Sequence, residues 1–269
     1  MIRSLTALAW ALLLIGGVQW LAGCKSSEET GYDETRDWSA ERLYTQAKEE
    51  LLGGDYKKAI SYYEKLGARY PYGRYAQQAQ LELGYAYHRD KEPANALAAA
   101  DRFIKLYPDH PNLDYAYYLK GLVNFNEDLG LFGDLANQDM SERDPRGARE
   151  SFEAYRELVT RFPDSRYAAD AYARMRYLVN SMASNEVRVA TYYMQRQAYI
   201  AAVNRAQFVL TNYPQTPAVE QALVVMVQAY DAMGLNELRD DAESTLKLNF
   251  PDTQYSLAGP YRKRWYQFW

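Results

Sequence analysis

Five aromatic–proline pairs recur along the sequence, and their spacing constrains the fold more than any other feature. The pairs are Tyr70-Pro71, Tyr107-Pro108, Phe162-Pro163, Tyr213-Pro214 and Phe250-Pro251. Successive prolines lie 37, 55, 51 and 37 residues apart. Proline cannot continue a helix, and it restricts the residue before it to extended conformations. The spacing therefore predicts a helical array of repeated units that each end at a proline, two of them carrying insertions.

Small and aromatic residues recur at fixed offsets before these prolines. In the first unit the order is small, glycine, small, aromatic, proline, supplied by Ala47, Gly54, Ala59, Tyr63 and Pro71. This is the order of a tetratricopeptide repeat, in which small residues let two helices touch and aromatic residues fill the space between turns. The second unit repeats it, and later units keep it less completely. Because no stretch alternates like a β-strand, we expect an all-α tetratricopeptide-repeat solenoid of about five helix pairs, or about ten helices. An irregular all-helical bundle is the alternative.

The N-terminal residues have the pattern of a bacterial export signal. A basic start at Arg3 precedes an almost wholly apolar run from Leu5 to Leu21. This is the organisation of a secretory signal peptide, and Leu21-Ala22-Gly23-Cys24 resembles a lipobox, at which the cysteine is lipidated. An uncleaved transmembrane anchor is the alternative, since the apolar run approaches spanning length. We predict a signal peptide at 1–23 and lipidation of Cys24, the only cysteine of the chain.

The residues after this cysteine predict where the protein resides. Lys25 rather than an aspartate follows it, which resembles the sorting pattern for the outer membrane. Residues 24–37 are polar and lack apolar periodicity, so they predict a flexible tether after the lipidated cysteine. Several acyl chains together hold a protein on a membrane persistently. The expected location is therefore the periplasmic face of the outer membrane, with the membrane reached through the lipid anchor.

Composition excludes several classes of function. The 269 residues carry a formal net charge of −4 and include two histidines, so there is no basic excess for a nucleic-acid partner and little material for zinc or acid–base chemistry. No nucleophile–histidine–acid set or phosphate-binding glycine loop stands out, and we expect neither an enzyme nor a cofactor. Asn124, Asn126 and Asp128 alternate as in a calcium loop, but Leu129 and Leu135 occupy the places that need glycine and glutamate. No metal site is expected.

Residues from about Trp38 to Pro251 resemble the BamD (ComL) family, lipoprotein subunits of the outer-membrane barrel assembly machinery. The runs that carry the resemblance are Tyr70-Pro71-Tyr72-Gly73, Gln78-Ala79-Gln80-Leu81, Asp101-Arg102-Phe103-Ile104, His110-Pro111-Asn112, Asp114-Tyr115-Ala116-Tyr117-Tyr118, Arg143-Asp144-Pro145, Ala190-Thr191-Tyr192-Tyr193 and Ala201-Ala202-Val203-Asn204-Arg205. The resemblance implies a non-enzymatic subunit that binds C-terminal targeting segments of unfolded barrel precursors. It also implies docking on BamA, the barrel-forming subunit, beside accessory lipoproteins. A different tetratricopeptide lipoprotein scaffold, such as a pilus-secretin pilot or a cell-envelope organiser, is the alternative.

Residues 38–123 hold the first two repeats and the first helix of the third, and we expect them to form a peptide groove. The first helix of each stacked repeat lines the concave face. The repeat register assigns to that face Tyr44, Lys48, Tyr85, His88, Arg89, Tyr115, Tyr118 and Phe125. Aromatic rings offer apolar area with little entropy to lose, and arginine can pair with a carboxylate, so this face suits an extended peptide with aromatic side chains and a carboxylate. The alternative is that about half of these tyrosines pack between helices.

Two further segments complete the predicted organisation. Residues 124–144 are expected to form an inserted surface loop, and residues 145–269 to form the C-terminal repeats with a capping tail. The resemblance implies that these repeats dock on the periplasmic domains of BamA, with Arg205 and Arg196 as candidate docking residues; an intrahelical ion pair is the alternative role for each. The basic, aromatic tail from Tyr261 to Trp269 is expected to cover the last repeat. A membrane interface or a partner groove is the alternative for this tail.

Overall fold

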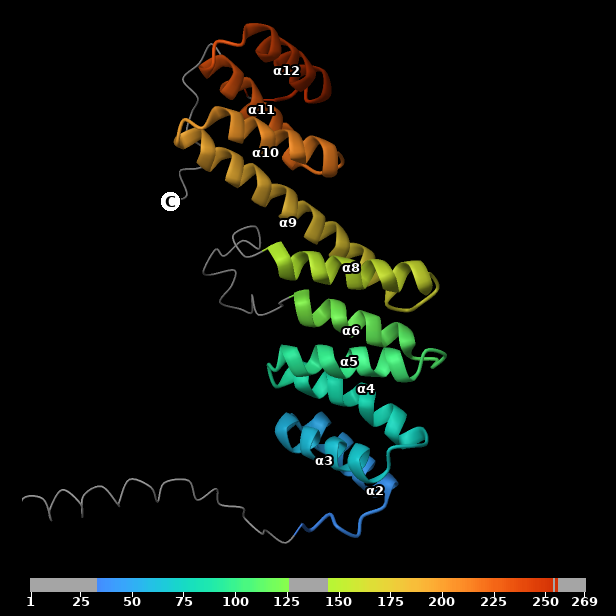
Figure 1. The fold of residues 1–269 in the computed structure, drawn as a ribbon. Helices are drawn as coiled ribbons and strands as arrows, with labels where there is room; N and C mark the ends of the chain where they lie inside the picture. Colours follow the sequence, from blue (N-terminus) through green and yellow to red (C-terminus); the bar gives the residue numbers. More distant parts are fainter. Residues whose placement is uncertain (1–32, 126–144, 254, 256–269) are drawn as a thin grey trace, which may run out of the picture. The chain divides into compact units, whose positions relative to one another are not determined.

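A computed structural model of the chain describes residues 33–125, 145–253 and 255. These residues contain ten helices and no strand (Figure 1). The helices are α2 (Ala40–Gly53), α3 (Tyr56–Arg69), α4 (Arg74–Arg89), α5 (Pro93–Leu106), α6 (Leu113–Phe125), α8 (Pro145–Arg161), α9 (Ala168–Gln195), α10 (Tyr199–Asn212), α11 (Ala218–Ala232) and α12 (Asn236–Asn249). All ten belong to one compact unit that begins at Ala40. The predicted all-α class is confirmed.

Successive helices pack against one another along the chain (Figure 1). They form five pairs, which are α2–α3, α4–α5, α6–α8, α9–α10 and α11–α12. The first helices of neighbouring pairs also touch, since α2 meets α4, α4 meets α6, and α9 meets α11. First helices therefore share one face of the stack, as in a tetratricopeptide solenoid. The predicted solenoid of five helix pairs is confirmed.

The aromatic–proline pairs end the second helix of each unit. After α3, Tyr70 takes a φ of −128° while its N–H still donates to the Leu66 carbonyl at 2.8 Å. Pro71 disfavours the helical region for the residue before it, so the helix stops there. The caps of α5, α10 and α12 have the same geometry, each with a φ of −131°. Phe162 caps α8 with an equivalent N–H to carbonyl bond.

Small residues lie where helices touch most closely. A Cβ atom added to Gly121 in α6 would lie 2.3 Å from the nearest ring atom of Tyr155 in α8, a tyrosine with no exposed surface. A Cβ atom on Gly84 in α4 would lie 3.0 Å from the side chain of Leu119 in α6. The small and aromatic positions of the repeat therefore work together: the missing Cβ creates the space that the neighbouring ring or branched chain fills.

The two insertions differ in kind. The extension of the fourth unit lengthens α9, which has 28 residues against 14 in its partner α10. The insertion of the third unit separates α6 from α8, and residues 126–144 of it lie outside the described part of the chain. Asn124 and Phe125 belong to the last turn of α6. None of the described helices has both the length and the apolar character needed to cross a membrane.

Other predictions also fall outside the described residues. They concern the signal peptide at 1–23, Cys24, residues 24–32 of the tether and the tail from residue 256 onward. Of the tether, residues 33–37 form a turn, in which the Thr35 hydroxyl donates to the Asp33 carboxylate at 2.7 Å. The prediction of a lipid anchor and that of a capping tail therefore rest on the sequence.

Candidate functional site

A cavity of about 580 Å³ lies on the face formed by the first helices. It is lined by α2, α4 and α6, by the first turn of α3, and by the turn that precedes α9. Four of the eight residues predicted for the peptide groove line it, namely Lys48, Tyr85, Arg89 and Tyr115. We call this hollow the groove cavity. It joins side chains from the first three repeats and from the start of the fourth.

A carboxylate that sequence analysis did not single out, Glu82, lies in the wall of the groove cavity and is 8% exposed. It accepts hydrogen bonds from the Tyr44 hydroxyl at 3.0 Å and the Tyr63 hydroxyl at 2.5 Å. It also accepts from the Lys48 ammonium at 2.6 Å and the Gln78 amide at 3.0 Å. Burial, together with the nearby Glu82 charge, raises the pKa of both tyrosines. Two predicted groove residues, Tyr44 and Lys48, are thus bound to a residue of the protein itself.

Two arginines of the groove cavity are held by aromatic rings. The Arg89 guanidinium lies 4.9 Å from the ring centre of Tyr56 and 5.8 Å from that of Tyr85, and it donates to the Tyr85 hydroxyl at 2.8 Å. The Arg166 guanidinium lies 4.7 Å from the ring centre of Tyr167 and donates to its hydroxyl. Such cation–π contacts orient a guanidinium without neutralising its charge. Within the described part of the chain, neither arginine forms an ion pair with a carboxylate.

Stacked tyrosines form one wall of the groove cavity and extend beyond it. Tyr167 stacks on Tyr118 with ring centres 4.7 Å apart, and its ring centre is 5.4 Å from that of Tyr115. The Tyr118 hydroxyl donates to the Asp170 carboxylate at 2.7 Å. Burial and this bond raise the pKa of Tyr118 to about 12. Burial alone would raise the pKa of Asp170, but hydrogen bonds from Tyr118 and Arg174 lower it.

The remaining predicted groove residues lie apart from the groove cavity. Phe125 continues the aromatic row, with Tyr155 and Tyr177 beside it and the Arg174 guanidinium 4.7 Å from its ring centre. His88 is half-buried in the last turn of α4 and is not among the residues that line the groove cavity. The structure thus joins part of the predicted set and adds Glu82. It also adds Arg166 and Tyr167, which precede α9 and which the repeat register does not assign to the groove.

The two predicted docking residues have separate surroundings. Arg205 in α10 donates to the carboxylate of Glu186 in α9 at 3.0 Å. Its side chain is 46% exposed, whereas that of Glu186 is 9% exposed. The ion pair therefore joins two helices, while the alternative considered from sequence was a pair within one helix. Arg196, at the end of α9, lies over the ring of Tyr192 at 5.2 Å.

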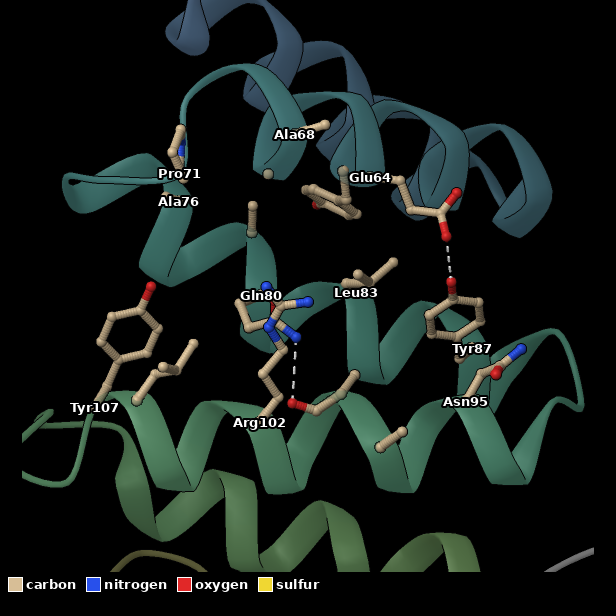
Figure 2. Close-up of a pocket in the computed structure, with 16 residues that line it drawn as sticks. Glu64, Ala68, Pro71, Ala76, Gln80, Leu83, Tyr87, Asn95, Arg102 and Tyr107 are labelled. Carbon is tan, nitrogen blue, oxygen red and sulfur yellow. Dashed lines mark hydrogen bonds between the residues drawn. The ribbon is translucent and has the colours of Figure 1, made fainter.

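A second cavity, of about 440 Å³, lies among α3, α4 and α5 (Figure 2). Its walls combine small residues with three tyrosines, and Arg102 is the one cation among the described residues that line it. The Tyr87 hydroxyl donates to the Glu64 carboxylate at 2.5 Å, and Gln80 donates to the Ala99 carbonyl at 3.3 Å. Figure 2 shows both bonds within the cavity wall. The groove cavity differs from it because it combines cations with stacked rings. Among the described residues, no cluster of histidine, cysteine, aspartate or glutamate is arranged to hold a metal ion.

The chain is similar in sequence to a known family of proteins. The model of the YfiO family, described as an outer membrane lipoprotein, matches residues 36–246. A protein of Neisseria meningitidis serogroup B named outer membrane protein assembly factor BamD is 48% identical over 238 residues, which cover 87% of this chain and 89% of that protein. The protein of the same name from Vibrio cholerae is 36% identical over 85% of this chain and 93% of its own length. A crystal structure of MamA protein is more distant, with 17% identity, 82% and 98% of the two chains covered, and a TM-score of 0.38. The chain belongs to the BamD family.

Proposed function

We propose that this protein is a non-enzymatic lipoprotein subunit of the outer-membrane β-barrel assembly complex. It is anchored by lipid on Cys24 at the periplasmic face of the outer membrane. It binds the C-terminal targeting segments of unfolded barrel precursors and docks on a BamA-like barrel protein together with accessory lipoproteins. Membership of a family whose relatives are named assembly factors supports this proposal. The single observation that carries the binding step is the groove cavity, with its tyrosine wall and two ring-held arginines.

The chemistry of the groove cavity fits a peptide with an aromatic end. Aromatic side chains that pack on Tyr115, Tyr167 or Tyr85 gain about 0.5–1.5 kcal/mol per ring pair beyond the area buried. A carboxylate that binds Arg89 or Arg166 forms charge-assisted hydrogen bonds, each worth about 1.5–3 kcal/mol. Both arginines are already oriented by rings, so little side-chain entropy is lost on binding. A C-terminal aromatic residue supplies a ring and a carboxylate on neighbouring atoms.

Photo-crosslinking tests the groove directly. A photoreactive residue in place of Tyr85 should form adducts with newly exported barrel proteins, because this position lines the groove cavity. The same residue in place of Ala98 is the matched control, since Ala98 is exposed and lines the second cavity. Adducts with barrel precursors at position 85 and none at 98 support the assignment. Equal labelling at both positions, or adducts at 85 with soluble periplasmic enzymes alone, would refute it.

Docking through Arg205 needs a design that separates the partner from the fold. An Arg205→Glu change by itself places two carboxylates side by side, one of them buried, and so destabilises the α9–α10 contact as well as any partner contact. The double change Arg205→Glu with Glu186→Arg restores an ion pair in the opposite sense. If Arg205 contacts the BamA-like partner, both variants lose co-purification. If the double variant recovers the partner, Arg205 acts through the fold and the docking assignment is wrong.

A further inference from the structure

The buried carboxylate of Glu82 pairs with one of the cations that line the groove cavity. Glu82 gathers donors from three helices: Tyr44 and Lys48 from α2, Tyr63 from α3, and Gln78 from its own helix, α4. A buried carboxylate is stable only when it is paired and hydrogen-bonded. Four donors within 3.0 Å meet that requirement. The first repeat is thereby joined to the second through both of its helices.

This network changes the charge that the groove cavity presents. Lys48 lines the cavity, but its ammonium lies 2.6 Å from a carboxylate oxygen of Glu82, so its charge is largely compensated inside the protein. Arg89 and Arg166 are instead held by tyrosine rings, which leave their charges uncompensated. The three basic side chains that line the cavity therefore differ in their capacity to bind an anion.

We propose that Glu82 is a positioning residue of the groove: by pairing with Lys48 and Tyr44 it leaves the ligand's carboxylate to Arg89 and Arg166, and so sets where along the groove a peptide terminus binds. This inference rests on the proposed peptide-binding function. It goes beyond that function because it assigns a role in ligand binding to Glu82, a residue whose hydrogen bonds are made to other side chains of the protein. It also predicts that the negative charge of Glu82, rather than its packing alone, matters for ligand choice.

The test measures binding of two peptides to the full mature chain by fluorescence anisotropy. The probes are a short synthetic peptide with alternating aromatic side chains and a C-terminal phenylalanine, made as the free acid and as the C-terminal amide. The wild-type chain should bind the acid about 10-fold or more tightly than the amide, because one charge-assisted interaction is lost. Glu82→Gln should tighten binding of the acid by about 3- to 10-fold while the amide changes less than about 2-fold, because Lys48 then becomes available.

A double-mutant cycle assigns the gain to Lys48. Lys48→Gln should change binding of the acid by less than about 2-fold in the wild-type chain, and it should abolish the gain in the Glu82→Gln chain. Tyr63→Phe is the control, since it removes one donor to Glu82 while leaving the carboxylate and the lysine in place. It should lower the melting temperature with no change in the ratio between the two peptides.

Three results would overturn the inference. Equal weakening of acid and amide by Glu82→Gln would mean that Glu82 only supports the fold. An equal effect of Lys48→Gln in both backgrounds would mean that Lys48 binds the ligand directly. Failure of the wild-type chain to bind either peptide would refute the proposed function, and the inference with it; in the first two cases the proposed function stands.

Discussion

Replacing Gly121 with alanine tests the packing logic of the repeat. The added Cβ would lie 2.3 Å from the nearest ring carbon of Tyr155, and three ring atoms of this tyrosine would lie within 2.6 Å. Tyr155 has no exposed surface and therefore no open space into which to move. Overpacking of this kind destabilises a protein by about 1–3 kcal/mol, and an approach this close belongs at the upper end. Alanine recovers about 1 kcal/mol through its better helix propensity.

The net expectation is a loss of about 2 kcal/mol in the free energy of unfolding. For a chain of this size, that corresponds to a fall of about 4–8 °C in the melting temperature. Gly67 in α3 provides a matched control: it is helical like Gly121 but exposed, and apart from its chain neighbours and the nearby backbone of its own helix no atom lies within 4 Å of its added Cβ. Gly67→Ala should therefore raise stability by about 0.5–1 kcal/mol. Both shifts can be measured by circular dichroism during thermal unfolding.

A second change, at Tyr155, tests whether the ring of this tyrosine causes the loss of stability. Tyr155→Leu removes the ring that the new methyl group would meet, so the double variant with Gly121→Ala should be more stable than the sum of the single changes predicts. Strict additivity of the two changes would refute the argument that the α6–α8 contact depends on the missing Cβ. So would a Gly121→Ala protein that is as stable as the Gly67→Ala control.

Two further predictions concern hydrogen-bonded tyrosines and acid stability. Tyr63→Phe leaves the buried Glu82 with one donor fewer and should lower the free energy of unfolding in urea by about 1–3 kcal/mol. Tyr87→Phe removes an exposed bond to Glu64 and should lower it by less than about 1 kcal/mol. Equal losses in the two variants would contradict the role of burial. The pKa of Asp170 is lowered in the folded state, so its stabilising contribution is present above its unfolded pKa of about 3.9 and is lost as the pH falls through the folded value. Asp170→Asn should therefore flatten the fall in melting temperature below about pH 4, and an unchanged acid profile would contradict this assignment.

The sequence was most informative about features that act locally. The aromatic–proline pairs predict the ends of α3, α5, α8, α10 and α12, because proline acts on its immediate neighbour in the chain whatever the tertiary context. The small positions predict close helix contacts for a related reason: the absence of a Cβ is a property of the residue itself. The long insertion in the fourth unit did not reveal its form, and only the structure shows that it extends α9.

The groove was less predictable because its properties depend on side chains from distant segments. The repeat register places Tyr85, Arg89 and Tyr115 on one face, and they line one cavity. It cannot indicate that Arg166 joins them, because this residue lies in a turn rather than on a first helix.

The sequence by itself determined the approximate number of helices, the positions at which the repeat units end and the family to which the chain belongs. These properties follow from local backbone restrictions and from residue order. Only the tertiary structure decided which basic side chains are paired with carboxylates inside the protein. Lys48 is paired because the contact between α2 and α4 brings it to Glu82, which lies 34 residues away in the chain. Arg205 is paired with Glu186 because α9 and α10 pack together. Such pairings require the stacked helices to bring side chains together, since electrostatic compensation depends on distance in space rather than on separation in sequence.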